Sequence, residues 1–113
     1  MSRVDQVSRL IQHNLAEIII GEIESPNFLI TISRVKCSPD LLVADVYMSV
    51  LPNNFSGTAL KKMRAKSGLL AKILKDRAYL TKTPRLNFFI DEDLKKMDEI
   101  DEILEIIKQE DKE

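Results

Sequence analysis

Hydrophobic residues recur along the N-terminal segment at intervals of three and four positions. They are Val4, Val7, Ile11, Leu15 and Ile18. This spacing places them on one face of a helix, so we predict an amphipathic helix over residues 2–22. Gly21 weakens its last turn, and Ser25-Pro26 ends it because proline cannot continue a helix.

The next two segments have the composition of β-strands. Residues 28–38 are rich in β-branched side chains, which favour strands. Residues 41–51 alternate in polarity, which is typical of a strand with one buried face. The residues expected on that buried face are Ala44, Val46, Met48 and Val50. Between the two segments, Ser38-Pro39-Asp40 has turn chemistry, and we predict that the strands pair as a hairpin.

The second half of the chain predicts further helical segments and a third strand. Residues 52–58 form a loop in which Ser56 or Thr58 can cap a helix that extends to residue 79. Residues 85–91 alternate again and form a strand. The side chains expected to point inward from that strand are Leu86, Phe88 and Ile90. A last amphipathic helix begins near Leu94, and its apolar seam consists of Met97, Ile100, Leu104 and Ile107.

The predicted order is therefore α-β-β-α-α-β plus a terminal helix. It predicts one α+β domain over residues 1–92, with helices on one face of a three-stranded sheet, and an acidic C-terminal helix and tail over residues 93–113. No apolar run approaches the roughly 20 residues that span a bilayer, and the N-terminus lacks the apolar stretch of a signal peptide. The single cysteine, Cys37, cannot form an internal disulfide, and we expect a cytoplasmic protein.

Ser67-Gly68 lies in the middle of the helical segment 58–79, although the chain has only three glycines. On one straight helix, the apolar residues of this segment would not share one face. A bend at Ser67-Gly68 removes the conflict, because glycine weakens a helix and the two pieces can then rotate independently. We expect the first piece to bury Leu60 and Met63, and the second to bury Leu69, Leu70, Ile73 and Leu74.

Charge is distributed unevenly along the chain. Residues 1–90 contain seven acidic and thirteen basic side chains, a net charge of +6, and residues 91–113 contain eleven and four, a net charge of −7. Residues 61–85 alone contain nine bases and a single acid, Asp76. Such asymmetry indicates a polyanionic partner for the domain and a separate role for the acidic end.

A helix that restarts after Gly68 exposes backbone N–H groups, which attract phosphate together with the helix dipole. Basic residues surround this position, so we predict an RNA-binding site there. The candidate RNA-binding residues are Arg64, Lys66, Ser67, Gly68, Lys72, Lys75, Arg77, Lys82 and Arg85. The alternative is a bend that serves packing only, with the lysines on an ordinary solvated face.

The sequence offers little for catalysis or metal binding. His13 is the only histidine and is expected to be exposed, and no neighbouring residue suggests a catalytic triad. Cys37 is the only cysteine and is expected to be buried or half-buried. One cysteine and one histidine do not make a zinc site. Tyr47 lies on the outer strand face, where it could stack on a base, although packing within the sheet is the simpler interpretation. We therefore predict no catalytic residues, no metal, no cofactor and no enzymatic activity.

Several local motifs together resemble a known family. They are Val7-x3-Ile11-x3-Leu15-Ala16-x-Ile18, Val35-x2-Ser38-x-Asp40-Leu41-x2-Ala44-x-Val46-Tyr47-x-Ser49, Ser67-Gly68, and Pro84-x-Leu86-x-Phe88 followed by Asp91. With the element order, they resemble a type II KH domain and, within that class, the ribosome-binding factor A family, over residues 2–104. The chain departs from these patterns at three points. The GxxG loop of RNA-binding KH domains is not possible, because the glycines are Gly21, Gly57 and Gly68. Lys66 stands where the family has alanine before the bend, and Gln6 stands where it tends to have arginine before the first-helix valine.

The resemblance implies a protein that binds the small ribosomal subunit and its rRNA during late maturation. It implies assistance to processing of the rRNA 5′-end region, without enzymatic activity, a cofactor, a small-molecule substrate or a membrane. We expect a monomer. Two alternatives stay open, an adaptor whose basic face binds an acidic protein and a small enzyme. The acidic terminal helix is expected to pack through Met97 and Ile100 and to compete weakly with RNA, or else to act only as a solubilising tail.

Overall fold

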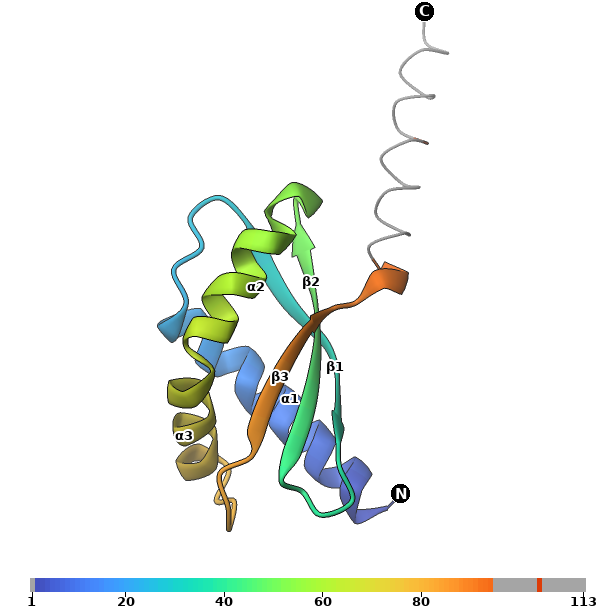
Figure 1. Ribbon diagram of the computed structural model, residues 1–113, viewed down its shortest axis with the longest axis vertical. Coiled ribbons are helices and arrows are strands. Elements are labelled where there is room, and N and C mark those ends of the chain that lie inside the picture. Colours follow the sequence, from blue (N-terminus) through green and yellow to red (C-terminus); the bar gives the residue numbers. More distant parts are fainter. Residues whose placement is uncertain (1, 95–103, 105–113) are drawn as a thin grey trace, which may run out of the picture.

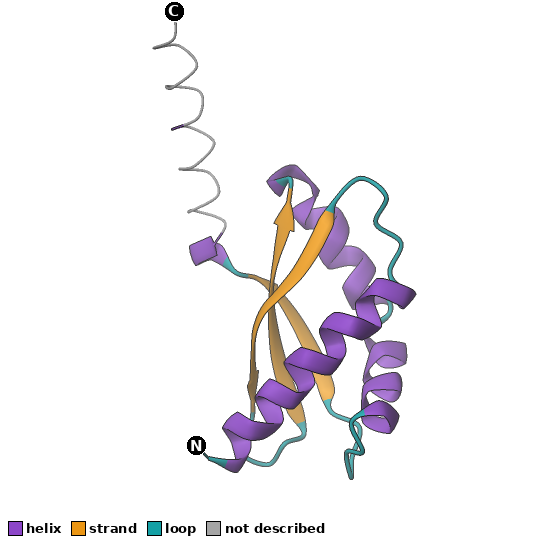
Figure 2. Cartoon of the chain, turned by 180° about the vertical axis from the view of Figure 1, so that it is seen from behind, coloured by secondary structure: helices purple, strands orange, loops and turns teal. Residues whose placement is uncertain are grey.

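The computed structural model describes residues 2–94 and 104. Its elements are α1 (Arg3–Glu22), β1 (Leu29–Cys37), β2 (Val43–Leu51), the short 3-10 helix η1 (Asn53–Phe55), α2 (Ser56–Ala65), α3 (Ser67–Arg77) and β3 (Arg85–Ile90). The predicted α+β order is confirmed. The strands lie in front of α1 in Figure 1 and behind it in Figure 2, the view from the opposite side, so α1 packs on one face of the sheet. Buried residues of α2 and α3 belong to the same core.

The three strands form a mixed sheet in the order β1-β2-β3. β1 and β2 are the predicted antiparallel hairpin, with an irregularity between Ile32 and Arg34. Its turn is held by the Asp40 carboxylate, which accepts hydrogen bonds from the Ser38 hydroxyl at 2.6 Å and the Leu42 N–H at 3.1 Å. β3 pairs with β2 in parallel, as the helical crossover through α2 and α3 allows. β3 is therefore an edge strand.

The core lies between the sheet and the helices. Every predicted inward residue of β2 is at most 1% exposed. The side chains that meet them from the other elements include Ile11, Leu15, Met63, Leu70, Leu74, Leu86 and Phe88. Alternation of polarity in the strands and the three-to-four spacing in α1 thus predicted the core correctly.

Side chains of α1 cover the outer edge of β1. Gln12 Nε2 donates to the carbonyls of Ile32 and Ser33 at 3.4 and 3.2 Å, and the Cys37 N–H donates to Ser8 Oγ at 3.1 Å. The Gln12 bonds satisfy carbonyls where the strand is irregular, and the Ser8 bond satisfies the amide of its last residue. The outer edge of β3 instead faces α2 and α3, and a cleft lies between them.

The predicted bend is confirmed, since α2 and α3 are separate helices that meet at Lys66 (φ −102°, ψ 10°). Three details were wrong. α3 begins at Ser67 rather than after Gly68. Leu69 is 47% exposed, because α3 docks through Leu70 and its neighbours on the opposite side. No side chain caps α2, because Ser56 is its first residue and its buried hydroxyl has no partner among the described atoms.

Other predictions fall outside the described part of the chain. Met97, Ile100 and Ile107 of the expected terminal seam lie outside the described residues, as do most of the acidic side chains of residues 93–113. The division at residue 92 stays a prediction. Among the described helices, none is long and apolar enough to cross a membrane.

Candidate nucleic-acid interface

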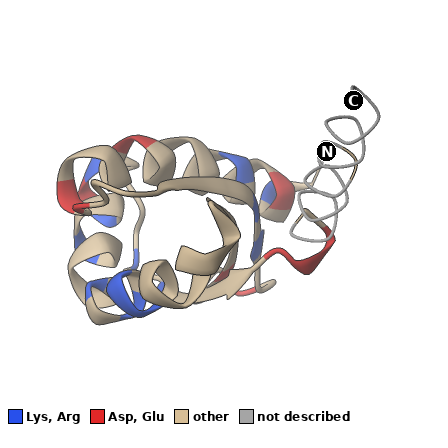
Figure 3. Ribbon diagram, turned by 90° about the horizontal axis from the view of Figure 1, so that it is seen from above, with Lys and Arg blue, Asp and Glu red and all other residues tan. Residues whose placement is uncertain are grey.

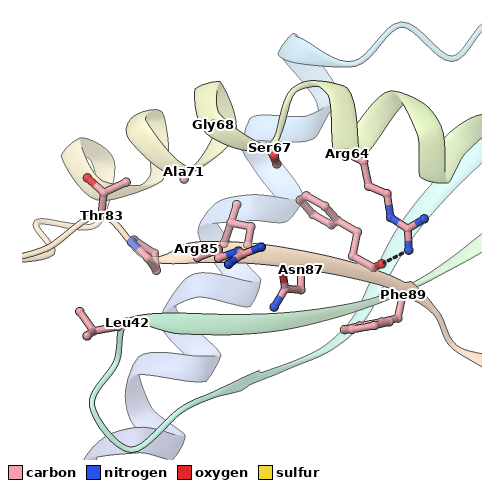
Figure 4. Close-up of a pocket in the computed structure, with 12 residues that line it drawn as sticks. Leu42, Arg64, Ser67, Gly68, Ala71, Thr83, Arg85, Asn87 and Phe89 are labelled. Carbon is pink, nitrogen blue, oxygen red and sulfur yellow. Dashed lines mark hydrogen bonds between the residues drawn. The ribbon is translucent and has the colours of Figure 1, made fainter.

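A cleft of about 730 Å³ lies between the joint of α2 and α3 and the edge strand β3 (Figure 4). Its lining residues are Leu42, Arg64, Ser67, Gly68, Ala71, Thr83, Pro84, Arg85, Leu86, Asn87, Phe88 and Phe89. One wall is thus a helix joint and the other is a strand with an open edge.

The helix wall presents backbone N–H groups. The Leu70 N–H donates to the Lys66 carbonyl at 2.9 Å, which is the first helical bond of α3. The amides of Ser67, Gly68 and Leu69 precede that bond and have no intrahelical acceptor, as in the first turn of any helix. Gly68 has no side chain to cover these amides, and the space beside its Cα is open, since an added Cβ would meet no atom within 4 Å. A phosphate could approach both the amides and the positive end of the helix dipole here.

The strand wall presents an open backbone edge. β3 bonds to β2 through alternate residues, with the Arg85 N–H donating to the Leu42 carbonyl at 2.8 Å and the Asp91 N–H to the Met48 carbonyl at 2.7 Å. The backbone groups of the intervening residues therefore point toward the cleft. One of them, the Phe88 carbonyl, accepts a hydrogen bond from Arg64 Nη2 at 3.2 Å across the cleft (Figure 4).

Four of the nine predicted RNA-binding residues line this cleft. They are Arg64, Ser67, Gly68 and Arg85. Two others are engaged elsewhere. Lys66 Nζ donates to the Glu22 carbonyl at the end of α1 at 2.7 Å, and Arg77 forms an ion pair with Glu17. The sequence could not show these contacts, because both depend on how α1 docks against the other helices.

The remaining three predicted residues lie outside the cleft lining. Lys72 and Lys75 are on α3, and Lys82 is in the segment before β3. The hydroxyl of Ser38 is the main cause that lowers the pKa of Asp40, and the charge of Lys82 contributes a smaller effect in the same direction. Figure 3 shows Lys and Arg along α2 and α3, whereas the turn after β3 is acidic. Lys72 and Lys75 therefore add positive charge to the helix that forms one wall of the cleft, whereas Lys82 lines a separate pocket beside α1 and the β1–β2 turn.

Sequence reasoning missed the residues that β3 contributes besides Arg85. Asn87 and Phe89 line the cleft together with Thr83 from the preceding segment. The alternation that predicted Leu86 and Phe88 as inward residues also places Asn87 and Phe89 on the opposite face, so the pattern contained the signal. What it lacked was the knowledge that β3 is an edge strand beside the helix joint.

Residues with potential catalytic chemistry are not gathered in the described structure. His13 is exposed, as predicted, and lies 3.3 Å from the Glu17 carboxylate. Cys37 is buried, as predicted. Within residues 2–94, no group of three His, Cys, Asp or Glu side chains is arranged to hold a metal ion.

Comparison with known proteins identifies the family. A family model described as Ribosome-binding factor A matches residues 3–104. The chain belongs to the ribosome-binding factor A family. Ribosome-binding factor A from Chlamydia felis is 32% identical over 114 residues, covering 97% of this chain and 95% of the relative. The family resemblance seen in the sequence is thereby confirmed.

Two structures from Thermus thermophilus have the same fold. The crystal structure of its ribosome-binding factor A matches with a TM-score of 0.70 at 26% identity, covering 79% of this chain and 97% of that one. A homology model of the Thermus protein, fitted into the cryo-EM map of its complex with 30S, matches with a TM-score of 0.68 at 26% identity, covering 76% and 92%. The family fold is therefore the mixed three-stranded α+β fold described above.

Proposed function

We propose that this chain binds the small ribosomal subunit and contacts its rRNA through the cleft between the α2–α3 joint and β3. Membership of the ribosome-binding factor A family supports the proposal, as does the complex of the Thermus relative with 30S. The observation that carries it is the meeting, in one cleft, of an exposed helix N-terminus, two arginines and an open strand edge.

Each part of the cleft suits a different part of an RNA strand. The amides of Ser67 and Gly68 and the guanidinium groups of Arg64 and Arg85 are donors for phosphate oxygens. The free backbone groups of β3 are donors and acceptors that can pair with the edges of unstacked bases. The cleft therefore fits single-stranded rRNA better than a double helix, whose base edges are already paired.

We further propose that the chain acts in the cytoplasm as a monomer during late maturation of the small subunit and its rRNA. In this role it needs no catalytic group of its own. Binding a strand in the cleft would hold that rRNA segment in one conformation while other steps proceed. The family resemblance and the arrangement of the cleft support this role.

The test is co-sedimentation with purified small subunits and direct binding to free small-subunit rRNA at several salt concentrations. Arg64→Gln and Arg85→Gln should each weaken binding and reduce the slope of log K against log[salt] by about 0.7–0.9, because each removes one phosphate contact. Arg9→Gln removes the same charge from α1, whose Arg9 lines a separate pocket, and should leave the affinity nearly unchanged.

Thermal unfolding of each variant separates lost contacts from lost folding, since Arg64 also bonds to the Phe88 carbonyl. Wild-type affinity in both cleft variants would overturn the assignment of the cleft. Binding to subunits with no affinity for free rRNA would favour an acidic protein partner instead.

A further inference from the structure

The face of the sheet opposite the helices carries a row of planar side chains that runs across all three strands. Arg34 on β1 is paired with Tyr47 on β2, and Tyr47 is paired with Phe89 on β3. The two aromatic rings stack with their centroids 5.5 Å apart, and the Arg34 guanidinium lies 4.1 Å from the centroid of the Tyr47 ring. The prediction that Tyr47 packs within the sheet is thus confirmed.

This row is accessible from solvent. Phe89 is 40% exposed, Tyr47 is half-buried and Arg34 is exposed, and no helix of the described chain packs on this face. Arg34 and Phe89 cover the two faces of the Tyr47 ring, so the aromatic face of this row that can receive a base is the one that Phe89 turns away from Tyr47. An exposed aromatic face on a sheet is suited to stacking on an unpaired base, because every base has a flat face.

The charges beside the row favour an anionic partner. Lys36, Arg34 and Arg85 are exposed on this face, and its carboxylates are already engaged. Asn87 Nδ2 donates to Asp45 Oδ1 at 3.3 Å, and the Ser33 hydroxyl donates to Asp91 Oδ2 at 2.8 Å. On the strands of this face, three cations therefore accompany two carboxylates that already accept hydrogen bonds. The exposed acids Glu92 and Asp93 lie beyond the end of β3, in the turn that follows it.

The row is continuous with the cleft. Arg85, Asn87 and Phe89 line the cleft, and all three lie on the strand face away from the helices. In Figure 4, the side chains of Asn87 and Phe89 point from β3 away from α2 and α3. A strand of RNA that leaves the cleft over the open edge of β3 reaches Phe89 first and Tyr47 next.

We propose that this face is a second contact surface for single-stranded RNA, on which the ring face that Phe89 turns away from Tyr47 stacks on one base of a strand that crosses β3 from the cleft. The proposal rests on the proposed function, because the cleft supplies the phosphate contacts that bring the strand to this edge. The stacking row adds affinity for bases, whereas the cleft adds affinity for the backbone.

Binding of a labelled single-stranded RNA of about ten nucleotides, compared with an abasic RNA of the same length, tests the two contributions separately. Phe89→Leu should weaken binding of the normal RNA by about five-fold or more, with an unchanged salt slope, and should not alter binding of the abasic RNA. Leu29→Ala is the matched control, since it removes another exposed apolar side chain from the same face.

Tyrosine fluorescence gives a second readout. The chain contains no tryptophan and two tyrosines, so Tyr79→Phe leaves Tyr47 as the only tyrosine. Tyr79 is 93% exposed in the turn after α3, and the substitution keeps the ring. A base stacked on Phe89, the ring that packs against Tyr47, should change the emission of Tyr47 with the normal RNA, and the abasic RNA should leave it unchanged.

The outcomes separate this proposal from the one on which it rests. If the wild-type chain binds neither RNA nor small subunits, both the proposed function and the stacking proposal are refuted. If Arg64→Gln weakens RNA binding while Phe89→Leu binds as the wild type does and the Tyr47 emission does not change, only the stacking surface is refuted. If Phe89→Leu loses affinity for subunits but not for the free RNA, the face binds a ribosomal protein and the stacking proposal is wrong.

Discussion

Replacing Gly68 with alanine separates the stability of the α2–α3 joint from its accessibility. Gly68 is the second residue of α3, its φ is not positive, and an added Cβ would meet no atom within 4 Å. A helical glycine without a special conformation costs stability, because it has more freedom in the unfolded chain. We therefore expect Gly68→Ala to raise the free energy of unfolding by about 0.4–1 kcal/mol.

The same methyl group should weaken RNA binding. Gly68 lines the cleft beside the first amides of α3, so the added Cβ occupies space that a phosphate would use. Blocking one such contact should cost about 0.5–1.5 kcal/mol of binding free energy. Stability and affinity should thus change in opposite directions, which general unfolding cannot produce.

Gly57→Ala provides a matched control. Gly57 is the second residue of α2, also follows a serine, and also has no atom within 4 Å of an added Cβ, but it does not line the cleft. Both variants should raise the midpoint of thermal unfolding by about 2–6 °C, and only Gly68→Ala should lose affinity for small-subunit rRNA. Destabilisation by Gly68→Ala, or equal affinity in both variants, would refute the reasoning.

Two further predictions concern the core and the end of β3. Leu70 is fully buried between α3 and the rest of the core, so Leu70→Ala should lower the free energy of unfolding in urea by about 2–5 kcal/mol, whereas the exposed neighbour Leu69→Ala should cost much less. The hydrogen bond from the Ser33 hydroxyl is the main cause that lowers the pKa of Asp91. The ionised carboxylate therefore stabilises the fold at any pH above its unfolded pKa of about 3.9. This stabilisation is lost as the pH falls through the lower pKa of the folded state. Asp91→Asn should therefore destabilise the protein at neutral pH, and the difference from the wild type should shrink in acid; a difference that does not depend on pH would contradict this.

The elements of the fold could be predicted because each has a local pattern. The apolar spacing in residues 2–22 follows the period of a helix, and the alternation in residues 41–51 follows that of a strand. The position of the bend was also predicted, from the glycine inside a helical segment, although one premise of that prediction was wrong, because Leu69 is exposed. These features depend on neighbouring residues and need no knowledge of the tertiary structure.

The failures depend on how distant elements dock. Leu69 was expected to be buried, but the rotation of α3 is determined by its packing against α1 and β3, and this rotation leaves Leu69 exposed. Lys66 was assigned to RNA, but it reaches the end of α1, forty-four positions earlier in the chain. Asn87 and Phe89 were missed because the open edge of β3 follows from strand order and parallel pairing, which the sequence pattern did not reveal.

Cross-linking from the cleft tests the central claim most directly. In a Cys37→Ala background, Ser67→Cys would carry a photoactivatable group at the start of α3, and Ala16→Cys would carry it on the exposed face of α1 as a control. On purified small subunits, irradiation should join position 67 to rRNA, and position 16 should give far less RNA product. Cross-links from position 16 alone, or from position 67 only to ribosomal protein, would contradict an RNA-binding cleft between the α2–α3 joint and β3.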